Sequence, residues 1–394
     1  MPRVFKIFFI TLTVSVAFLL GLYFGGHYYR LSLIFYALPE SVRNAFFPGD
    51  NILQLQREVE GILQDNFYKP VDPANMENSA MEGMINSLED PYTAYFSPED
   101  FRYFMEHTNG SFVGVGVLLE TKDGKLTIVD TIEGSPAQGA GIKPGDIITA
   151  VDDQTIEGKT EEEAVAFMRG KEGTKVVLHI RRGEEDIDFE LTRKAIEIPI
   201  ISEKMLDRSG KKIGYVRLDQ FSLDAGPKVQ GAVDRLTNDG AQAIILDLRN
   251  NGGGLLDEAV NVGSVFIEDG PIVSVVSRDG KSEVYNARGD ANETIPMVVL
   301  VNGYTASASE IVAGAIKDDV RGKLIGEKTF GKGVVQNINP LSNGGAIKFT
   351  SGSYYTPRGI DINKIGIEPD IQTVDDPATP ADEVIERALF ELAS

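Results

Sequence analysis

The chain lacks cysteine and has only three histidines, His27, His107 and His179, among 394 residues. The lack of cysteine excludes a thiol nucleophile, thiolate metal ligands and disulfide bonds. It is compatible with an extracytoplasmic compartment, although cytosolic chains can lack cysteine too. His27 follows an apolar N-terminal stretch and His179 lies in a strand-like run, so His107 is the one conceivable base of a histidine triad, and a surface or packing role suits it better. The counts argue against thiol-based and histidine-based catalysis.

Positive charge is also scarce: the chain has 38 Lys and Arg residues and 59 Asp and Glu residues, which gives a net charge of −21. Nucleic-acid binding depends on cationic contacts to phosphate, so we expect no nucleic-acid partner. The sequence has no HExxH or comparable ligand spacing, and we expect no metal and no other cofactor. A length of 394 residues with 42% hydrophobic residues predicts two or three globular domains.

Lys332 lies between two glycines in TFGKGVVQ, Thr329 to Gln336. Lysine normally keeps its proton at neutral pH, with a reference pKa of about 10.4, and acts as a base where burial or positive neighbours disfavour the ammonium. The glycines let the backbone pack closely, and no acidic residue stands within two positions. Gln336 could orient the amine without adding negative charge. The segment therefore suits a general base that needs no histidine.

An apolar strand-like run, Ile295 to Asn302, leads through small residues into the helix-like SEIVAGAIKDD. A strand-to-helix corner exposes a nucleophile and leaves N–H groups of the first helical turn near a developing oxyanion. Thr305, Ser307 and Ser309 all compete for the nucleophile's position. The physical chemistry of the segment does not choose among them.

TASASEI followed by TFGKGVVQ resembles the serine/lysine signature of the carboxyl-terminal processing peptidases, also called tail-specific proteases. The resemblance implies that Ser307 is the nucleophile and that Lys332, 25 positions later, is the general base. Gln336 is by the same resemblance the residue that orients the lysine. The two motifs together favour a peptidase site, whereas a lone serine in a run of small residues is more often a helix cap.

The run LDLRNNGGG, Leu246 to Gly254, is similar to a second motif of that family, a strand that ends in a glycine-rich turn. By this likeness the backbone N–H groups of Gly253 and Ala308 form the oxyanion hole. The segment GEKTFGKG nearly matches a phosphate-binding loop, but Gly333 stands where a magnesium-holding hydroxyl is required. We therefore do not expect nucleotide binding.

The stretch from Ile7 to Tyr23 is uncharged and nearly reaches the about 20 residues that span a bilayer. Arg3 and Lys6 precede it, and positive charge on that side predicts a cytoplasmic N-terminus and an exported body. A cleaved signal peptide is the alternative, but no small-x-small cleavage pattern follows directly. We expect a single-pass anchor in the inner membrane with a periplasmic catalytic body, or secretion into the periplasm if the segment is cleaved.

Apolar spacing divides the remainder into a helical part, a part with short β-like runs and turns, and a part that alternates strand and helix. The alternation predicts an α/β (α+β) core with a buried sheet, which the family resemblance implies is similar to the crotonase/ClpP-like fold. The expected organisation is a membrane anchor or signal segment at 1–30, a helical region at 51–108, a PDZ domain at 111–194, a serine peptidase core at 195–373 and a C-terminal helix at 374–394.

The element order of the β-like part resembles a PDZ domain, most clearly at GAGIKPGDIITAVD, Gly139 to Asp152. PDZ domains add an extended chain end as a strand and bind its terminal carboxylate through backbone N–H groups. Val115, Gly116 and Val117 lie where that carboxylate loop is expected, although a hairpin without a ligand is the alternative. Arg169 could couple a bound ligand to the catalytic site, or be a solvated charge at a helix end.

These features predict a membrane-tethered serine endopeptidase that recognises the C-terminal tails of exported proteins through its PDZ domain and cleaves near them. The family resemblance implies a preference for apolar tails. A homo-oligomer and an activating adaptor or lipoprotein are further expected partners. A non-enzymatic alternative is a membrane-anchored PDZ adaptor with an inactive core, against which the intact Ser307, Lys332 and Gln336 argue. The crotonase likeness suggests an acyl-CoA-handling protein as a second rival, but the PDZ insertion and Lys332 argue against it.

Overall fold

The computed structural model describes residues 51–122, 124–289, 291–376 and 378–393. Contacts divide the chain into two compact units, Met1–Tyr95 and Phe96–Ser394. The expected membrane anchor or signal segment lies outside the described residues. Among the helices that the structure does describe, none is long and apolar enough to cross a membrane.

The first unit contains α4 (Asn51–Asn66) and α5 (Pro73–Asn86). The Asp72 carboxylate accepts the N–H of Ala74 at 3.0 Å, and a proline opens α5, so this helix begins with a favourable cap. None of the α5 side chains is buried. The short strand β1 (Ala94–Phe96) straddles the boundary between the units.

A β-rich region follows α6 (Pro98–Asn109), the first helix of the second unit. Its main sheet has the order β3-β4-β5-β7-β8, with β6 paired to β5, and every pairing is antiparallel. The separate antiparallel pair β2–β9 joins the two ends of the region. The elements are β2 (Ser111–Gly114), β3 (Val117–Lys122), β4 (Lys125–Thr131), α7 (Pro136–Ala140), β5 (Ile147–Val151), β6 (Gln154–Thr155), α8 (Glu161–Met168), β7 (Lys175–Arg182), β8 (Glu185–Thr192) and β9 (Lys194–Glu197).

The core of the part that follows the β-rich region is a sheet of order β10-β11-β12-β15-β16-β19. The β10–β11 pair is antiparallel and the others are parallel, so the sheet is mixed. Strands β12 and β15 are buried along their whole length, as expected for central strands covered on both faces. The strands are β10 (Ile201–Arg208), β11 (Lys211–Leu218), β12 (Ala243–Asp247), β15 (Met297–Val301), β16 (Lys323–Gly326) and β19 (Ile371–Gln372).

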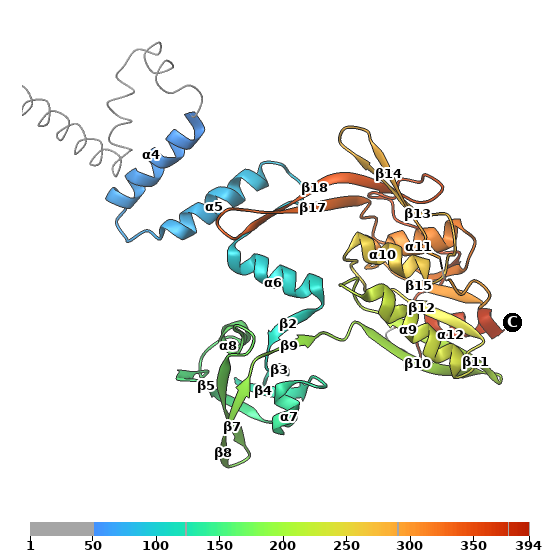
Figure 1. The fold of residues 1–394 in the computed structure, drawn as a ribbon, viewed down its shortest axis with the longest axis horizontal. Coiled ribbons are helices and arrows are strands. Elements are labelled where there is room, and N and C mark those ends of the chain that lie inside the picture. Colours follow the sequence, from blue (N-terminus) through green and yellow to red (C-terminus); the bar gives the residue numbers. More distant parts are fainter. Residues whose placement is uncertain (1–50, 123, 290, 377, 394) are drawn as a thin grey trace, which may run out of the picture. The chain divides into compact units, whose positions relative to one another are not determined.

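Alternate residues of the central strands face two separate apolar clusters, because side chains alternate across a sheet. Ile244 and Leu246 join the larger cluster with α9, α10 and α11, whereas Ala243 and Ile245 join the cluster that contains α12. Figure 1 shows these helices around the sheet. The helices are α9 (Ala225–Asn238), α10 (Leu256–Ser264), α11 (Ala308–Asp318) and α12 (Glu383–Ala393).

A further antiparallel sheet contains the β17–β18 hairpin, and β18 also pairs with β13, which pairs with β14. Figure 1 shows the long hairpin in orange and red. The strands are β13 (Pro271–Ser277), β14 (Ser282–Asn286), β17 (Val334–Pro340) and β18 (Ala346–Tyr355). The lysine-bearing segment thus leads directly into β17, and the serine-bearing corner follows β15.

Candidate active site

Ser307 lies at the corner between β15 and α11, as the strand-to-helix pattern predicted. It has φ 57° and ψ −118°, a backbone conformation that non-glycine residues rarely adopt. Such strain costs on the order of 1–3 kcal/mol and clusters at functional sites. The corner holds the serine side chain at the start of the helix.

The two competing hydroxyls are fully buried and hydrogen-bonded. Thr305 Oγ1 donates to the Leu248 carbonyl at 2.9 Å, and Ser309 Oγ donates to the Asn251 carbonyl at 2.9 Å. Both therefore join the serine corner to the glycine-rich turn after β12. Ser307 instead lines a cavity, so the geometry favours it among the three candidates.

That cavity has a volume of about 490 Å³ and is lined by 20 residues. They come from α6, the segment after β11, the glycine-rich turn with the start of α10, the serine corner with α11, and the β17–β18 hairpin with the lysine segment before it. The fold thereby brings segments that are distant in the sequence to one site. All five residues that the sequence assigned to catalysis and the oxyanion hole lie on its wall, namely Ser307, Lys332, Gln336, Gly253 and Ala308.

Lys332 is half-buried between Gly331 and Gly333. A Cβ atom built on Gly331 would lie 2.8 Å from the backbone nitrogen of Gly366, and one on Gly333 would lie 2.6 Å from that of Asn363. Both glycines are required by close backbone approach, as the sequence suggested. The Gln336 amide nitrogen donates to the Val334 carbonyl at 3.2 Å, so the role of Gln336 in orienting the lysine stays a prediction.

Glu310 is a completely buried carboxylate that sequence reasoning missed. Its Oε2 accepts the backbone N–H of Ser307 and that of Lys332, each at 2.9 Å. Its Oε1 accepts the Thr329 hydroxyl at 2.6 Å and the Gly331 N–H at 2.8 Å. Four donors satisfy the buried charge, and one side chain thereby holds the serine and lysine segments together.

Tyr354 provides a second link between the same two backbones. Its hydroxyl lies 2.5 Å from the Lys332 carbonyl and 3.1 Å from the Ser307 carbonyl, and its single proton can be donated to either. The side chain is 1% exposed, so its position is set by packing. Glu310 holds the N–H groups and Tyr354 contacts the carbonyl groups of the two candidate catalytic residues.

The two predicted oxyanion donors are adjacent. A Cβ atom on Gly253, whose φ is +98°, would lie 2.8 Å from the Ala308 nitrogen and 2.8 Å from Ser307 Cβ. Ala308 is the first residue of α11, and the N–H of such a residue has no partner within its own helix. The Gly253 N–H donates to Asn251 Oδ1 at 2.9 Å, so the Asn251 side chain engages one of the two donors in this conformation.

The predicted carboxylate loop of the β-rich region is tightly packed. Gly116 has φ +81°, and a Cβ there would lie 2.2 Å from Ser135 Cβ, so this position requires glycine. The Gly116 carbonyl accepts the Ser135 hydroxyl at 3.2 Å, and the Val115 carbonyl accepts the Ala137 N–H at 2.9 Å. Val117 begins β3. Peptide binding by this loop stays a prediction.

Arg169 lies at the end of α8, where its side chain contacts α6 and is 20% exposed. Its Nη1 is 3.0 Å from Glu106 Oε2, and its guanidinium lies 4.8 Å from the Tyr103 ring centroid and 5.9 Å from that of Phe112. The same helix contributes Phe104 to the cavity wall. The contact gives the β-rich region a physical connection to the helix that lines the cavity.

A signal for Glu310 was present in the sequence. It stands three residues after Ser307, the capping-box spacing at which an acidic side chain reaches back to the first N–H of a helix. Tyr354 has no comparable local signal, because its contacts lie 22 and 47 positions away. The contact between Asn251 and the Gly253 N–H spans only two positions, but it depends on the orientation of the Asn251 side chain.

Comparison with protein families matches residues 212–373 to Peptidase family S41, 127–182 to the PDZ domain and 50–100 to the Activating protease CtpB N-terminal domain. The Carboxy-terminal processing protease CtpA of Bacillus subtilis is 38% identical over 375 residues, 94% of this chain and 78% of that relative. A Probable CtpA-like serine protease of Staphylococcus aureus is 38% identical over 319 residues, 80% of this chain and 63% of the relative.

Among solved structures, the photosystem II D1 C-terminal processing protease is 29% identical with a TM-score of 0.49, over 87% of this chain and 96% of that one. The chain spans less than two thirds of the length of the Staphylococcus aureus relative, at 63%. The Bacillus subtilis relative is matched over most of both lengths. The chain therefore belongs to the carboxyl-terminal processing peptidases of peptidase family S41.

Proposed function

We propose that this protein is a serine endopeptidase in which Ser307 is the nucleophile and Lys332 the general base. The observation that carries the proposal is that both residues, with Gln336 and the Gly253–Ala308 pair, line one cavity. Lys332 takes the proton of the Ser307 hydroxyl as it attacks a peptide carbonyl, and the amides of Gly253 and Ala308 stabilise the oxyanion. Water then hydrolyses the acyl-enzyme. Gln336 orients the lysine amine.

The preferred substrate is an extended chain end with apolar side chains. Apolar residues line the cavity beside the serine, among them Leu256, Ile311 and Val335. The PDZ domain recognises the tail through Val115, Gly116 and Val117, and Arg169 couples that binding to the cavity through α6. Exported proteins with apolar C-terminal tails are thus the proposed substrates, and an adaptor or lipoprotein could activate the enzyme.

The adaptor alternative would need no chemically competent site. The strained Ser307 backbone and the four hydrogen bonds to Glu310 support a site held for catalysis. The crotonase/ClpP-like resemblance of the core stays a proposal, and acyl-CoA handling does not account for the paired serine and lysine motifs.

Self-association is proposed through the first unit. Helices α4 and α5 and the turn after them expose several large apolar side chains, including Leu55, Val59, Met84 and Leu88, at 48–60% exposure. Burying such a face against a second copy is favourable by about 25 cal/mol per Å² of apolar surface. Light scattering of the full chain should show a dimer or larger assembly that Val59→Glu weakens and Gln64→Glu leaves unchanged.

The proposed location is the inner membrane, with the catalytic body in the periplasm. The uncharged stretch after Arg3 and Lys6 supports it. A reporter enzyme that is active only outside the cytoplasm, fused after residue 394, should be active and membrane-bound. A soluble active reporter would indicate cleavage of the segment, and an inactive one would contradict export.

The activity is tested with an unfolded reporter protein that ends either in an apolar tail or in a charged tail of equal length. The full chain should cleave the apolar-tailed reporter faster, and Ser307→Ala and Lys332→Ala should abolish cleavage. Lys328→Ala is the matched lysine control, because Lys328 lies in the same segment and pairs with Glu368 at the surface. Cleavage that survives both site variants would refute the proposed dyad, whereas tail binding without cleavage by any form would favour the adaptor.

A further inference from the structure

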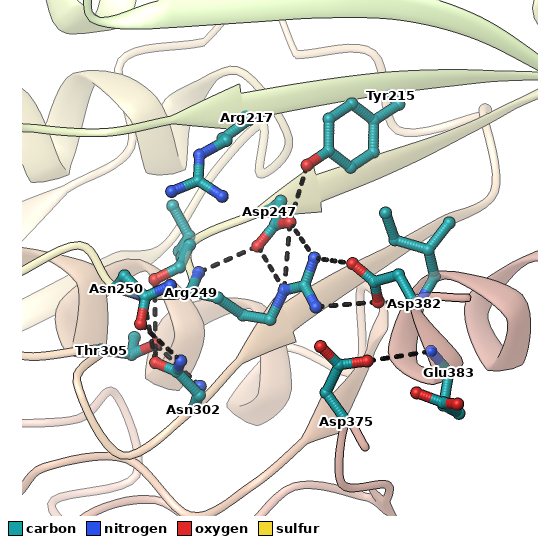
Figure 2. A network of polar contacts seen from close by, with 12 residues as sticks. Tyr215, Arg217, Asp247, Arg249, Asn250, Asn302, Thr305, Asp375, Asp382 and Glu383 are labelled. Carbon is teal, nitrogen blue, oxygen red and sulfur yellow. Dashed lines mark hydrogen bonds and ion pairs between the residues drawn. The ribbon is translucent and has the colours of Figure 1, made fainter. Parts of the chain in front are cut away.

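Arg249 lies between two carboxylates from distant parts of the chain (Figure 2). Asp247 is at the end of β12, and Asp382 immediately precedes α12. The Arg249 side chain is 10% exposed, and its guanidinium bonds to Asp382 at 2.8 and 2.9 Å in a two-point contact. Such paired contacts fix the orientation of a guanidinium as well as its position.

Asp247 holds Arg249 from the other side. The Asp247 carboxylate is completely buried and accepts the Arg249 backbone N–H at 2.9 Å and the Tyr215 hydroxyl at 2.8 Å, besides the Arg249 side chain. Burial acts to lower the pKa of Arg249, but hydrogen bonds to Asp247 and Asp382 raise that pKa above its ordinary value. The Arg249 guanidinium therefore stays protonated where it lies between the two carboxylates.

The position of Asp382 is set by hydrogen bonds to the first turn of α12, whereas its partner Arg249 belongs to the glycine-rich turn. Its Oδ1 accepts the Ile385 N–H at 2.9 Å, and its backbone carbonyl accepts the Glu386 N–H at 2.9 Å. The helix then packs against one face of the central sheet through a buried apolar stripe, Val384, Ala388, Leu389 and Leu392. Asp382 thus presents a carboxylate from a rigid element.

Arg249 opens the segment that carries the proposed oxyanion donor. After it, Asn250 exchanges two hydrogen bonds with Asn302, its N–H donating at 3.0 Å and its Oδ1 accepting at 2.9 Å. Asn251 then accepts the Ala306 N–H at 3.0 Å and engages the Gly253 N–H at 2.9 Å. The direction in which the glycine-rich turn leaves β12 sets the position of the Gly253 N–H relative to Ser307.

We propose that Asp382 is a positioning residue for the peptidase reaction, which acts through Arg249 to fix the glycine-rich turn against the serine corner. The inference rests on the proposed function of Ser307 and Gly253. It makes the helix after residue 382 part of the catalytic apparatus in addition to its packing role. Asp382 itself touches no reacting atom, so its effect is on the placement of the oxyanion donor.

The expected phenotype is a defect in the chemical step. Asp382→Asn keeps the shape of the side chain but removes the charge that pairs with Arg249. A displaced oxyanion donor lowers kcat, and since a shift of about 1 Å can reduce a rate about 100-fold, we expect kcat to fall about 10- to 100-fold with KM nearly unchanged. Asp382→Glu should recover part of the rate, because the longer carboxylate still reaches the guanidinium.

The experiment uses the full chain, the apolar-tailed reporter and a fluorophosphonate probe that reacts with activated serines. Glu386→Gln is the matched control, because Glu386 lies on the same helix and pairs with Arg208 at 2.7 Å. Thermal unfolding is measured for each protein.

The proposal predicts slower cleavage and slower probe labelling of Asp382→Asn at unchanged KM, with Glu386→Gln like wild type. If Asp382→Asn does not fold, Arg249→Lys supplies the test, since it keeps the charge but loses the two-point contact.

Equal kcat for wild type and the folded Asp382→Asn variant, or for Arg249→Lys where that variant replaces it, would overturn the inference while leaving the proposed function intact. The inference would also be overturned if Asp382→Asn and Glu386→Gln lost kcat equally and lost thermal stability equally. That result would show that the helix has only a structural role. A wild-type protein inert toward both reporter and probe would instead remove the proposed function, and this inference with it.

Discussion

Glu310 accepts the backbone N–H of Lys332 at 2.9 Å, although the two residues are 22 positions apart in the sequence. The same oxygen accepts the N–H of Ser307. A buried carboxylate thereby fixes the backbone of the proposed nucleophile relative to the backbone of the proposed base. Substitutions that remove this contact should therefore change the activity.

Glu310→Gln should lower both activity and stability. A glutamine places an NH₂ group against backbone N–H groups, so at least one buried donor loses its acceptor. The unfolding free energy should fall by about 1–3 kcal/mol and kcat by about 100-fold or more. Denaturant unfolding and reporter cleavage measure the two effects. Glu327→Gln, an exposed carboxylate in the neighbouring loop, is the control; a fully active Glu310→Gln enzyme would refute the positioning role.

Tyr354→Phe should slow catalysis without unfolding the protein. The substitution keeps the buried ring but removes the hydroxyl at the carbonyls of Lys332 and Ser307. If roughly 1.4 kcal/mol of positioning is lost, kcat falls about tenfold. Steady-state kinetics on the apolar-tailed reporter provide the measurement. Tyr355→Phe, on the adjacent residue of β18, should behave like wild type, and identical kinetics for both variants would contradict the prediction.

Gly253→Ala should abolish activity, because the added methyl group would clash with the serine corner. The positive φ of Gly253 adds strain but is not the main cause. The added Cβ would lie 2.7 Å from the Ala306 carbonyl oxygen and 2.8 Å from the Ala308 nitrogen. Gly280→Ala is a matched control, since Gly280 has φ +78° but a Cβ added there would meet no neighbouring side chain or backbone within 4 Å. Probe labelling of Ser307 should be lost in the first variant and kept in the second. Labelling of Gly253→Ala at the wild-type rate would show that the turn does not meet the serine.

Asp146 should make the β-rich region sensitive to acid. Burial acts to raise the pKa of Asp146, but hydrogen bonds from Arg182 and from the Lys143 N–H, with the Arg182 charge, hold that pKa below its ordinary 3.8. A lowered native pKa gives stability that is complete above pH 3.8 and is lost as the pH falls through the lower native pKa. The stability advantage of wild type over Asp146→Asn should be constant at about pH 5–7 and should shrink below about pH 4. An advantage that is unchanged at about pH 2–3 would contradict the ion-pair explanation.

The central features of the site were predictable because they depend on short motifs. Ser307 and Lys332 stand in runs of small residues where a corner and a close backbone approach are needed, and the structure places both on one cavity. The alternation of strands and helices likewise predicted a mixed α/β core, and the structure has one. Local spacing and side-chain size predicted the strand-to-helix corner, the close-packed glycines and the core, whereas the choice of Ser307 over Thr305 and Ser309 came from the family resemblance.

The residues that hold the site together were not predictable in this way. Glu310 resembles an ordinary first-turn acid, Tyr354 an ordinary strand residue and Asp382 an ordinary cap, because each acquires its role from partners far along the chain. The engagement of the Gly253 N–H by Asn251 depends on one side-chain orientation. The predicted anchor lies outside the described residues, and the predicted domain boundaries stay predictions.

The dyad is tested most directly by locating the covalent adduct that a peptidyl fluorophosphonate leaves on the full chain. Mass spectrometry of the digested protein should find one adduct, on Ser307, formed rapidly by wild type and at least about 100-fold more slowly by Lys332→Ala, which lacks the base. Ser307→Ala should form none. An adduct on another residue, or equal labelling rates for wild type and Lys332→Ala, would contradict a serine nucleophile activated by Lys332.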